Sequence, residues 1–353
     1  MSEVLLVINP GSTSTKFALW GREGCITEQV VRHSADKLAP AVADQLNYRT
    51  ELIDSAIKPL LAGHKVVGVV GRGGLLKPMR GGTYRVNETM INDLHSPTIS
   101  NHASNLGALI AHHFAEQFGV DAYIVDPVTV DEFVDVARIS GVKWCERKSR
   151  GHALNIKYSA RRAADDLGKN LEDTRFVIAH FGGGTSVAAL LGGRIIDTND
   201  ALHGMGPFSP ERAGALPLSA LIERCFTEGV TKKGLLDELA RKSGLMAYCG
   251  TSDVREVIKM IESGDPQAEL IFRAMVYQDA KEIGAMGAVL EGSIDAVIIT
   301  GGLAHSVEFI SMLRPYIDYL GTIIIYPGEG ELEAMSAGAW RVIDGVEAAL
   351  AYK

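Results

Sequence analysis

The sequence lacks any apolar run that approaches the roughly 20 residues needed to cross a bilayer, so we expect no membrane association. Its 353 residues include only four cysteines, and no two of them form a C-x-x-C pair. That pattern argues against a zinc ribbon or a disulfide framework and favours a reduced, cytoplasmic setting. The formal net charge is −8. An acidic chain without a basic stripe argues against nucleic acid as a partner.

Several catalytic signatures are missing as well. The chain has no P-loop and no G-x-G-x-x-G turn. It also has no G-x-S-x-G elbow and no H-E-x-x-H pair. P-loop and dinucleotide-binding folds, serine hydrolases and zinc proteases of those types therefore have no support.

Two segments far apart in the chain share one pattern, residues 7–21 and residues 178–192. Each has an apolar stretch, a polar residue (Asn9 or His180), a tract of glycine and hydroxyl residues, and a second apolar stretch. Each predicts a β-hairpin whose bend presents N–H and O–H donors to phosphate oxygens. Two ordinary hairpins are the alternative, but the matching register favours a duplicated fold that binds an anion.

Short β-branched runs alternate with helical patterns, which is typical of α/β architecture, and the length suits two domains. Four expected strands run into an ionisable residue or a glycine pair, at Arg72, Asp126, His180 and Gly301-Gly302. Ligands of open α/β sheets bind beyond the carboxyl ends of the strands. These positions therefore predict a shared cleft. A helix is expected over residues 332–351.

Two arginines have a setting that suits an anionic ligand. Arg72 follows a strand among three glycines, where a bare backbone would let it lie along a ligand, and Arg212 lies in a loop stiffened by two prolines. The planar guanidinium matches phosphate or carboxylate, although each could be a surface arginine. Gly301-Gly302 would let a flat group such as a base approach, or would simply form a tight turn.

Together these pieces resemble the acetate/butyrate kinase (acetokinase) family, within the superfamily of acetate and sugar kinases, heat-shock ATPases and actin. The resemblance covers essentially the whole chain and rests on residues 9–16, 180–186 and 300–302. Residues 206–217 look most like the butyrate kinase branch. Residues 150–155 read RGHALN, where acetate kinases carry a Gly-Thr-Ser stretch after the histidine, and this argues against acetate as the preferred substrate.

The resemblance implies a duplicated, two-domain ribonuclease-H-like (actin-like ATPase) fold, with mixed sheets flanked by helices and a cleft between the domains. The implied N-terminal domain is residues 1–153, with a C-terminal helix at about 336–353 packing back on it. The implied C-terminal domain is residues 154–335 and holds the adenosine pocket. Self-association as a homodimer or higher homo-oligomer is also implied.

The resemblance further implies ATP/ADP and Mg²⁺ as cofactors and a short-chain carboxylate, butyrate or isobutyrate, as the substrate. The implied catalytic residues are Asn9, Arg72, Asp126, His152, His180 and Arg212. The implied nucleotide-binding residues are Gly11, Ser12, Thr13, Ser14, Thr15, Lys16, Gly182, Gly183, Gly184, Thr185, Gly301, Gly302 and Leu303. The implied metal residues are Asp126 and Glu331, with Glu329 as the alternative to Glu331, and His102 lies further out.

The implied reaction is direct in-line transfer of a phosphoryl group to the acid. A fatty-acid carboxyl group has a pKa of roughly 4.3 and is already a nucleophile at neutral pH, so no general base is needed. One alternative is a kinase for acetate or propionate. Another is an actin-like or heat-shock-like ATPase module without a metabolic substrate, which would leave Arg72 and Arg212 unexplained.

Overall fold

The computed structural model describes residues 1–34, 37–96, 102–203 and 205–353. The chain divides into an N-terminal unit, residues 1–130 and 330–353, and a C-terminal unit, residues 131–329. The sequence-based boundaries lie instead after residues 153 and 335. Residues 131–153 belong with the C-terminal unit because Glu132 pairs with Lys157 at 2.9 Å and Arg147 pairs with Asp197 at 2.7 Å.

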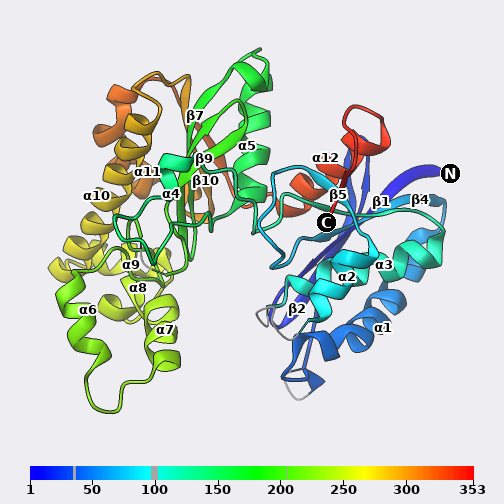
Figure 1. Cartoon of the computed structure of the whole chain (residues 1–353), viewed down its shortest axis with the longest axis horizontal. Helices are drawn as coiled ribbons and strands as arrows, with labels where there is room; N and C mark the ends of the chain where they lie inside the picture. Colours follow the sequence, from blue (N-terminus) through cyan, green and yellow to red (C-terminus); the bar gives the residue numbers. More distant parts are fainter. Residues whose placement is uncertain (35–36, 97–101, 204) are drawn as a thin grey trace. The chain divides into compact units, whose positions relative to one another are not determined.

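The N-terminal unit is built on a mixed seven-stranded sheet in the order β12-β5-β6-β4-β1-β2-β3 (Figure 1). Strands β1 to β3 form an antiparallel meander, and β4 and β6 continue the sheet parallel to β1. The strands are β1 (Ser2–Pro10), β2 (Ser14–Gly21), β3 (Gly24–Arg32), β4 (His64–Arg72), β5 (Thr83–Arg85), β6 (Ala122–Val125) and β12 (Leu350–Ala351).

Helices cover both faces of this sheet. On one face lie α1 (Leu46–Ile57), α2 (Glu88–His95) and α3 (Asn105–Phe118), whose apolar side chains form one core with Ile8, Phe17 and Ile124. On the other face α12 (Glu331–Ile343) packs on β1, β4 and β6. Two arginines bind the ends of α12: Arg72 of β4 pairs with Glu331, and Arg22 in the turn between β2 and β3 pairs with Asp344.

The C-terminal unit is built on a five-stranded sheet in the order β11-β10-β7-β8-β9. Its strands are β7 (Arg175–Phe181), β8 (Thr185–Leu191), β9 (Arg194–Thr198), β10 (Ala296–Gly301) and β11 (Ile323–Pro327). Helix α5 (Ala153–Asp166) lies on one face, and α10 (Pro266–Val289) and α11 (Val307–Ile317) lie on the other (Figure 1). The shorter helices are α4 (Asp135–Arg138), α6 (Leu218–Cys225), α7 (Lys232–Arg241), α8 (Gly244–Cys249) and α9 (Val254–Glu262).

The duplication predicted from the two hairpins is confirmed by the sheets. Strands β7, β8 and β9 form the same antiparallel meander as β1, β2 and β3, and β10 and β11 continue it in parallel as β4 and β6 do. Across the first hairpin Asn9 lies opposite Lys16, and across the second His180 lies opposite Ser186. The two glycine bends therefore occupy the same place in each unit.

The expected C-terminal helix is wrong beyond residue 343. The helix ends at Ile343, Gly345 follows with φ of +72°, and Leu350–Ala351 form β12 beside β5. A left-handed glycine ends a helix at low cost, and the strand covers an otherwise unpaired edge of β5. Among the described residues, no helix combines the length and the apolar character needed to span a bilayer.

Candidate active site

Glu331, the first residue of α12, contacts two predicted site residues of the N-terminal unit. Its Oε1 accepts a hydrogen bond from Arg72 Nη1 at the end of β4, and its Oε2 accepts one of 2.5 Å from Asn9 Nδ2 on β1. Three elements distant in sequence therefore meet at one carboxylate, whose charge the N-terminal end of α12 also stabilises. The alternative, Glu329, lies in the C-terminal unit, where its carbonyl accepts from Asn155.

The glycines after Arg72 were expected to leave a bare backbone on which the arginine could lie along a ligand, but in the structure they allow close packing on other elements. A Cβ on Gly73 would overlap Pro127, and a Cβ on Gly74 would lie 2.6 Å from Asn105 Oδ1. The same Asn105 oxygen accepts a 2.8 Å hydrogen bond from the backbone N–H of Leu75. The segment is thus fixed against the start of α3, and Arg72 is held in place.

Asp126 directly follows β6 and is buried, with φ of +38°. This φ is uncommon for a residue with a Cβ, although aspartate tolerates it better than most, and such backbones are frequent at functional sites. Oδ1 accepts a 2.7 Å hydrogen bond from the backbone N–H of Gly82, and the backbone N–H of Asp126 donates to the Gly82 carbonyl. The carboxylate is therefore fixed at the edge of the sheet where β4 also ends.

The first glycine bend is organised by Arg49, a fully buried residue of α1 that the sequence reasoning missed. Its Nη1 donates to the carbonyls of Gly11 at 2.8 Å and Ser14 at 3.3 Å, and its Nη2 donates to that of Ser12 at 3.0 Å. Because N–H and C=O point in opposite directions across a trans peptide, the amides of Ser12 and Thr13 are directed away from Arg49. The bend thus presents donors on its outer side.

The remaining residues of the first tract have different surroundings. Ser12 and Thr13 are exposed, whereas Thr15 is buried and its hydroxyl lies 2.8 Å from His33 Nε2. Burial, with a smaller effect of the Arg49 charge, lowers the pKa of His33 to about 4, so this ring is neutral at pH 7. Lys16 is largely exposed and pairs with Glu28 at 3.4 Å. The hydroxyl of Thr15 therefore supports the bend from inside.

In the C-terminal unit, His180 and His152 stack with their ring centroids 4.0 Å apart. His180 Nδ1 lies 2.8 Å from Asn155 Oδ1, and His152 Nδ1 lies 2.8 Å from Ser186 Oγ. Asn155 also donates from Nδ2 to the Glu329 carbonyl at 2.6 Å. The two predicted histidines thus form one cluster at the start of α5 and the end of β7.

Arg212 lies against the second glycine bend. A Cβ on Gly184 would overlap the guanidinium, so only glycine allows this approach. Nη1 donates to the Ala201 carbonyl at 2.6 Å, and Nε is buried without a hydrogen-bond partner within the part of the chain that the structure describes. Burial lowers the pKa of Arg212 below its usual value. A desolvated guanidinium with an unused donor is suited to an anion.

The two glycines at the end of β10, Gly301 and Gly302, have different surroundings. Gly301 has φ of +89°, and a Cβ there would overlap the Phe181 carbonyl oxygen, so this glycine is needed for the fold. A Cβ on Gly302 would meet no atom within 4 Å, and the neighbouring Leu303 is partly buried against the core. Space beside the backbone is therefore found at Gly302 alone of the two.

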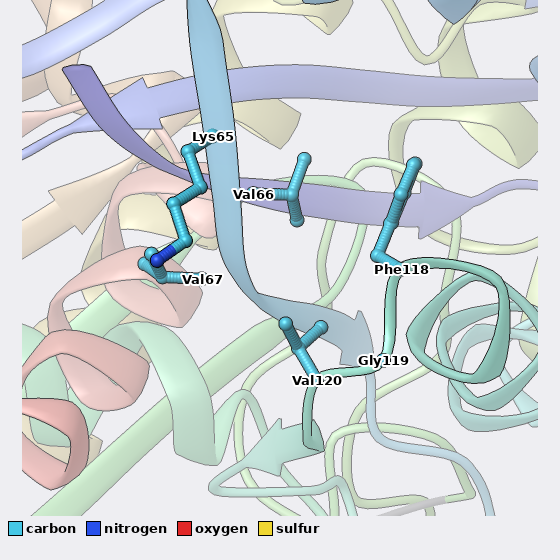
Figure 2. A pocket seen from close by; sticks show the side chains of 6 residues that line it. All are labelled: Lys65, Val66, Val67, Phe118, Gly119 and Val120. Atoms are coloured by element: carbon cyan, nitrogen blue, oxygen red, sulfur yellow. The ribbon is translucent and has the colours of Figure 1, made fainter. Parts of the chain in front are cut away.

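The other predicted features contribute little to this candidate site. His102 Nδ1 lies 2.7 Å from Ser104 Oγ just before α3, apart from the contacts of Glu331. Within the described ranges, no three His, Cys, Asp or Glu side chains gather as metal ligands. A separate pocket has a volume of about 500 Å³. Figure 2 shows the residues that line it, Lys65, Val66, Val67, Phe118, Gly119 and Val120. It lies at the start of β4, the opposite end from Arg72, and so is separate from this site.

A model described as the acetokinase family matches residues 134–323, more than half of the chain. Among solved structures, the chain is similar to acetate kinase from Porphyromonas gingivalis, with 19% identity and a TM-score of 0.78 over 96% of this chain and 99% of that one. It is also similar to a propionate kinase from Francisella tularensis, with 19% identity and a TM-score of 0.72 over 95% and 98%.

A more distant likeness is to ROK hexokinase from Thermus thermophilus, with 13% identity and a TM-score of 0.52 over 97% of this chain and 99% of that one. Acetate kinases and ROK sugar kinases share the actin-like ATPase fold. The duplicated two-domain fold expected from the sequence is thus confirmed.

Proposed function

We propose, since this chain belongs to the acetokinase family of carboxylate kinases, that it transfers the γ-phosphoryl group of ATP to butyrate or isobutyrate. The products are ADP and the acyl phosphate. The observation that carries the proposal is Arg212, which is partly buried and whose buried Nε has no hydrogen-bond partner among the described residues. A bound anion would stabilise a guanidinium that is desolvated and has an unused donor.

The chemistry requires no base. One oxygen of the acid carboxylate attacks the γ-phosphorus, a new P–O bond forms, and the bond to the β-phosphate oxygen breaks with its electron pair leaving on ADP. Two unit charges 4 Å apart interact by about 4 kcal/mol at an effective dielectric of 20, so repulsion between carboxylate and triphosphate is the main obstacle. Positioned positive charge is what phosphoryl transfer chiefly needs.

Residues of both units are assigned to binding the phosphates and stabilising their charge. In the N-terminal unit, Arg72 and Asn9 are oriented by Glu331, and the bend of residues 11–16 donates to phosphate oxygens. In the C-terminal unit, Arg212, His152 and His180 stabilise charge on the transferred group, and residues 182–185 bind phosphate. Residues 301–303 are assigned to adenosine, which is supported by the open space beside Gly302.

Mg²⁺ is assigned to Asp126 and Glu331. Protein-bound Mg²⁺ at nucleotide sites usually takes one or two carboxylates besides phosphate oxygens and water, and this pair supplies that number. Both carboxylates are held by hydrogen bonds from Gly82, Arg72 and Asn9, which fixes their orientation. When bound, the ion would supply positive charge to the phosphate chain.

The reaction is tested by trapping. With ATP, Mg²⁺ and butyrate, hydroxylamine is expected to yield a hydroxamate in proportion to the ADP formed, because it reacts with an acyl phosphate. Omitting butyrate is the control and should stop both products. ADP formation that is independent of added acid and gives no hydroxamate would contradict a carboxylate kinase and favour an ATPase module.

The acid is tested by kcat/KM over straight and branched acids of two to five carbons. We expect the maximum at butyrate or isobutyrate, because residues 206–217 resemble the butyrate kinase branch. Each methylene that fills or leaves a hydrophobic pocket changes kcat/KM by about 10- to 200-fold. A maximum at acetate or propionate, the acids named for the two similar kinases, would overturn this choice while leaving the reaction class intact.

A further inference from the structure

Asn155 lies in the first turn of α5, is buried, and joins three elements of the C-terminal unit. Its Nδ2 donates to the Glu329 carbonyl at 2.6 Å and to Thr300 Oγ1 at 3.2 Å. Its Oδ1 lies 2.8 Å from His180 Nδ1. No catalytic or binding role was predicted for Asn155 from the sequence.

These partners determine which way the amide faces. The Glu329 carbonyl can only accept, so the group that meets it must be the NH₂. Thr300 Oγ1 donates its own proton to the Gly328 carbonyl at 3.1 Å, so it accepts from Asn155 as well. The oxygen of Asn155 is therefore the atom that faces His180. Since an amide oxygen can only accept, His180 Nδ1 must carry a proton.

The contact between the neighbouring ring of His152 and Ser186 does not fix a tautomer in this way. Ser186 Oγ accepts a 3.3 Å hydrogen bond from the backbone N–H of His152 and lies 2.8 Å from its Nδ1. A hydroxyl can donate to Nδ1 or accept from it, so His152 can stay neutral with its proton on Nε2. Two cationic rings with centroids 4.0 Å apart would repel each other, which favours a single charge on the pair.

We propose that Asn155 is a positioning residue that fixes His180 in the tautomer with the proton on Nδ1. A Cβ on Gly182 would lie 3.5 Å from His180 Nε2, so this second nitrogen faces the start of the glycine bend. In the fixed tautomer, Nε2 donates a hydrogen bond only when the ring is an imidazolium. His180 then brings a hydrogen bond and a positive charge together to an anion at the bend. This use in turnover rests on the proposed function, whereas the tautomer does not.

The tautomer is measured directly by ¹H–¹⁵N correlation through the two-bond couplings of the imidazole ring, in the full chain without nucleotide and at a pH where the ring is neutral. The His180 signals are assigned by their loss in His180→Gln. We expect the Nδ1–H tautomer in the wild type and in Ser186→Ala, which alters only the His152 contact. In Asn155→Leu, which removes the acceptor at similar volume, we expect the proton to move to Nε2.

Asn155→Asp distinguishes the acceptor contact with His180 from the donor contact with Glu329. It also keeps the proposal testable if Asn155→Leu does not fold. A carboxylate still accepts from Nδ1, so the Nδ1–H tautomer should persist, although the donor to Glu329 is lost. If the wild type carries its proton on Nε2, or if Asn155→Leu folds and keeps the Nδ1–H form, the proposal is overturned. No substrate is present, so a failure of the proposed reaction would leave these spectra unchanged.

A kinetic readout follows for the butyrate reaction. Asn155→Leu should lower kcat by about 10²-fold, because the neutral Nε2–H ring can still donate a hydrogen bond but no longer brings the positive charge that stabilises the transition state. The KM for ATP should change much less, because the glycine bend itself is untouched. A purely structural role would lower the unfolding temperature without this separation of kcat from KM, and unchanged kcat would overturn the role in turnover.

Discussion

Replacement of Arg212 by alanine is expected to lower kcat by about 10³-fold, as removal of a catalytic arginine does in other phosphoryl transferases, without lowering the unfolding temperature. In the protein alone, the guanidinium is desolvated, and its Nε has no partner among the described residues. Desolvation of its charge costs the folded state free energy, which works against the stabilisation from its hydrogen bond to the Ala201 carbonyl. Removing the charge relieves that cost, so activity and stability should separate. Steady-state kinetics and thermal unfolding of the same preparation measure both.

Two variants sharpen this test. Arg212→Lys keeps the charge but loses the planar fork that lies against Gly184, so kcat should remain low. Arg138→Ala is the matched control in the same unit, because Arg138 binds both oxygens of Asp131 at 2.8 Å and takes no part in the proposed site. It should lower the unfolding temperature and leave kcat unchanged. Near-normal turnover in Arg212→Ala would remove this residue from the mechanism.

Much of the fold could be predicted because it follows from local patterns. The repeated hairpins at residues 7–21 and 178–192 specify two similar sheets, and Asp265 and Pro266 specify the start of α10. The last strand could not be predicted in this way. Leu350–Ala351 pairs with β5, itself only three residues long, and such a pairing depends on the completed sheet rather than on local periodicity.

Part of the candidate site could be predicted from where polar side chains fall in the sequence pattern. Arg72 and His180 were predicted from their positions at strand ends and Asn9 from the repeated hairpin, and the structure shows Asn9 and Arg72 at one carboxylate, Glu331. The residues that orient the site were missed. In the sequence, Arg49 is not distinguished from the other polar residues of a helical pattern. Its three hydrogen bonds to carbonyls of the first bend are evident only in the folded chain.

Asn155 had a signal that the sequence reasoning left unused. It ends the stretch 150–155, which departs from the pattern of acetate kinases, and it is an amide in the first turn of a helix that begins beside a predicted catalytic histidine. An amide there can cap the helix or bind a neighbouring side chain. The choice between these depends on where β10 and Glu329 lie, which the local sequence does not specify.

Replacement of Arg72 by alanine is expected to lower both kcat and stability, in contrast to Arg212→Ala. The loss of kcat should again be about 10³-fold. Arg72 is the charged partner of Glu331, and their side chains are only 12% and 25% exposed. Removing one partner of a largely buried pair costs about 1–3 kcal/mol, and it also frees the start of α12. Chemical unfolding of the variant measures the loss.

The double variant Arg72→Ala with Glu331→Gln distinguishes the two effects. An amide at position 331 removes the uncompensated charge, so part of the stability should return while kcat stays low. Arg22→Ala is the matched control, because Arg22 binds Asp344 at the other end of α12 and has no part in the proposed site. It should leave kcat unchanged. If Arg22→Ala lowers kcat as much as Arg72→Ala does, anchoring of α12 rather than contact with the substrate would explain both losses.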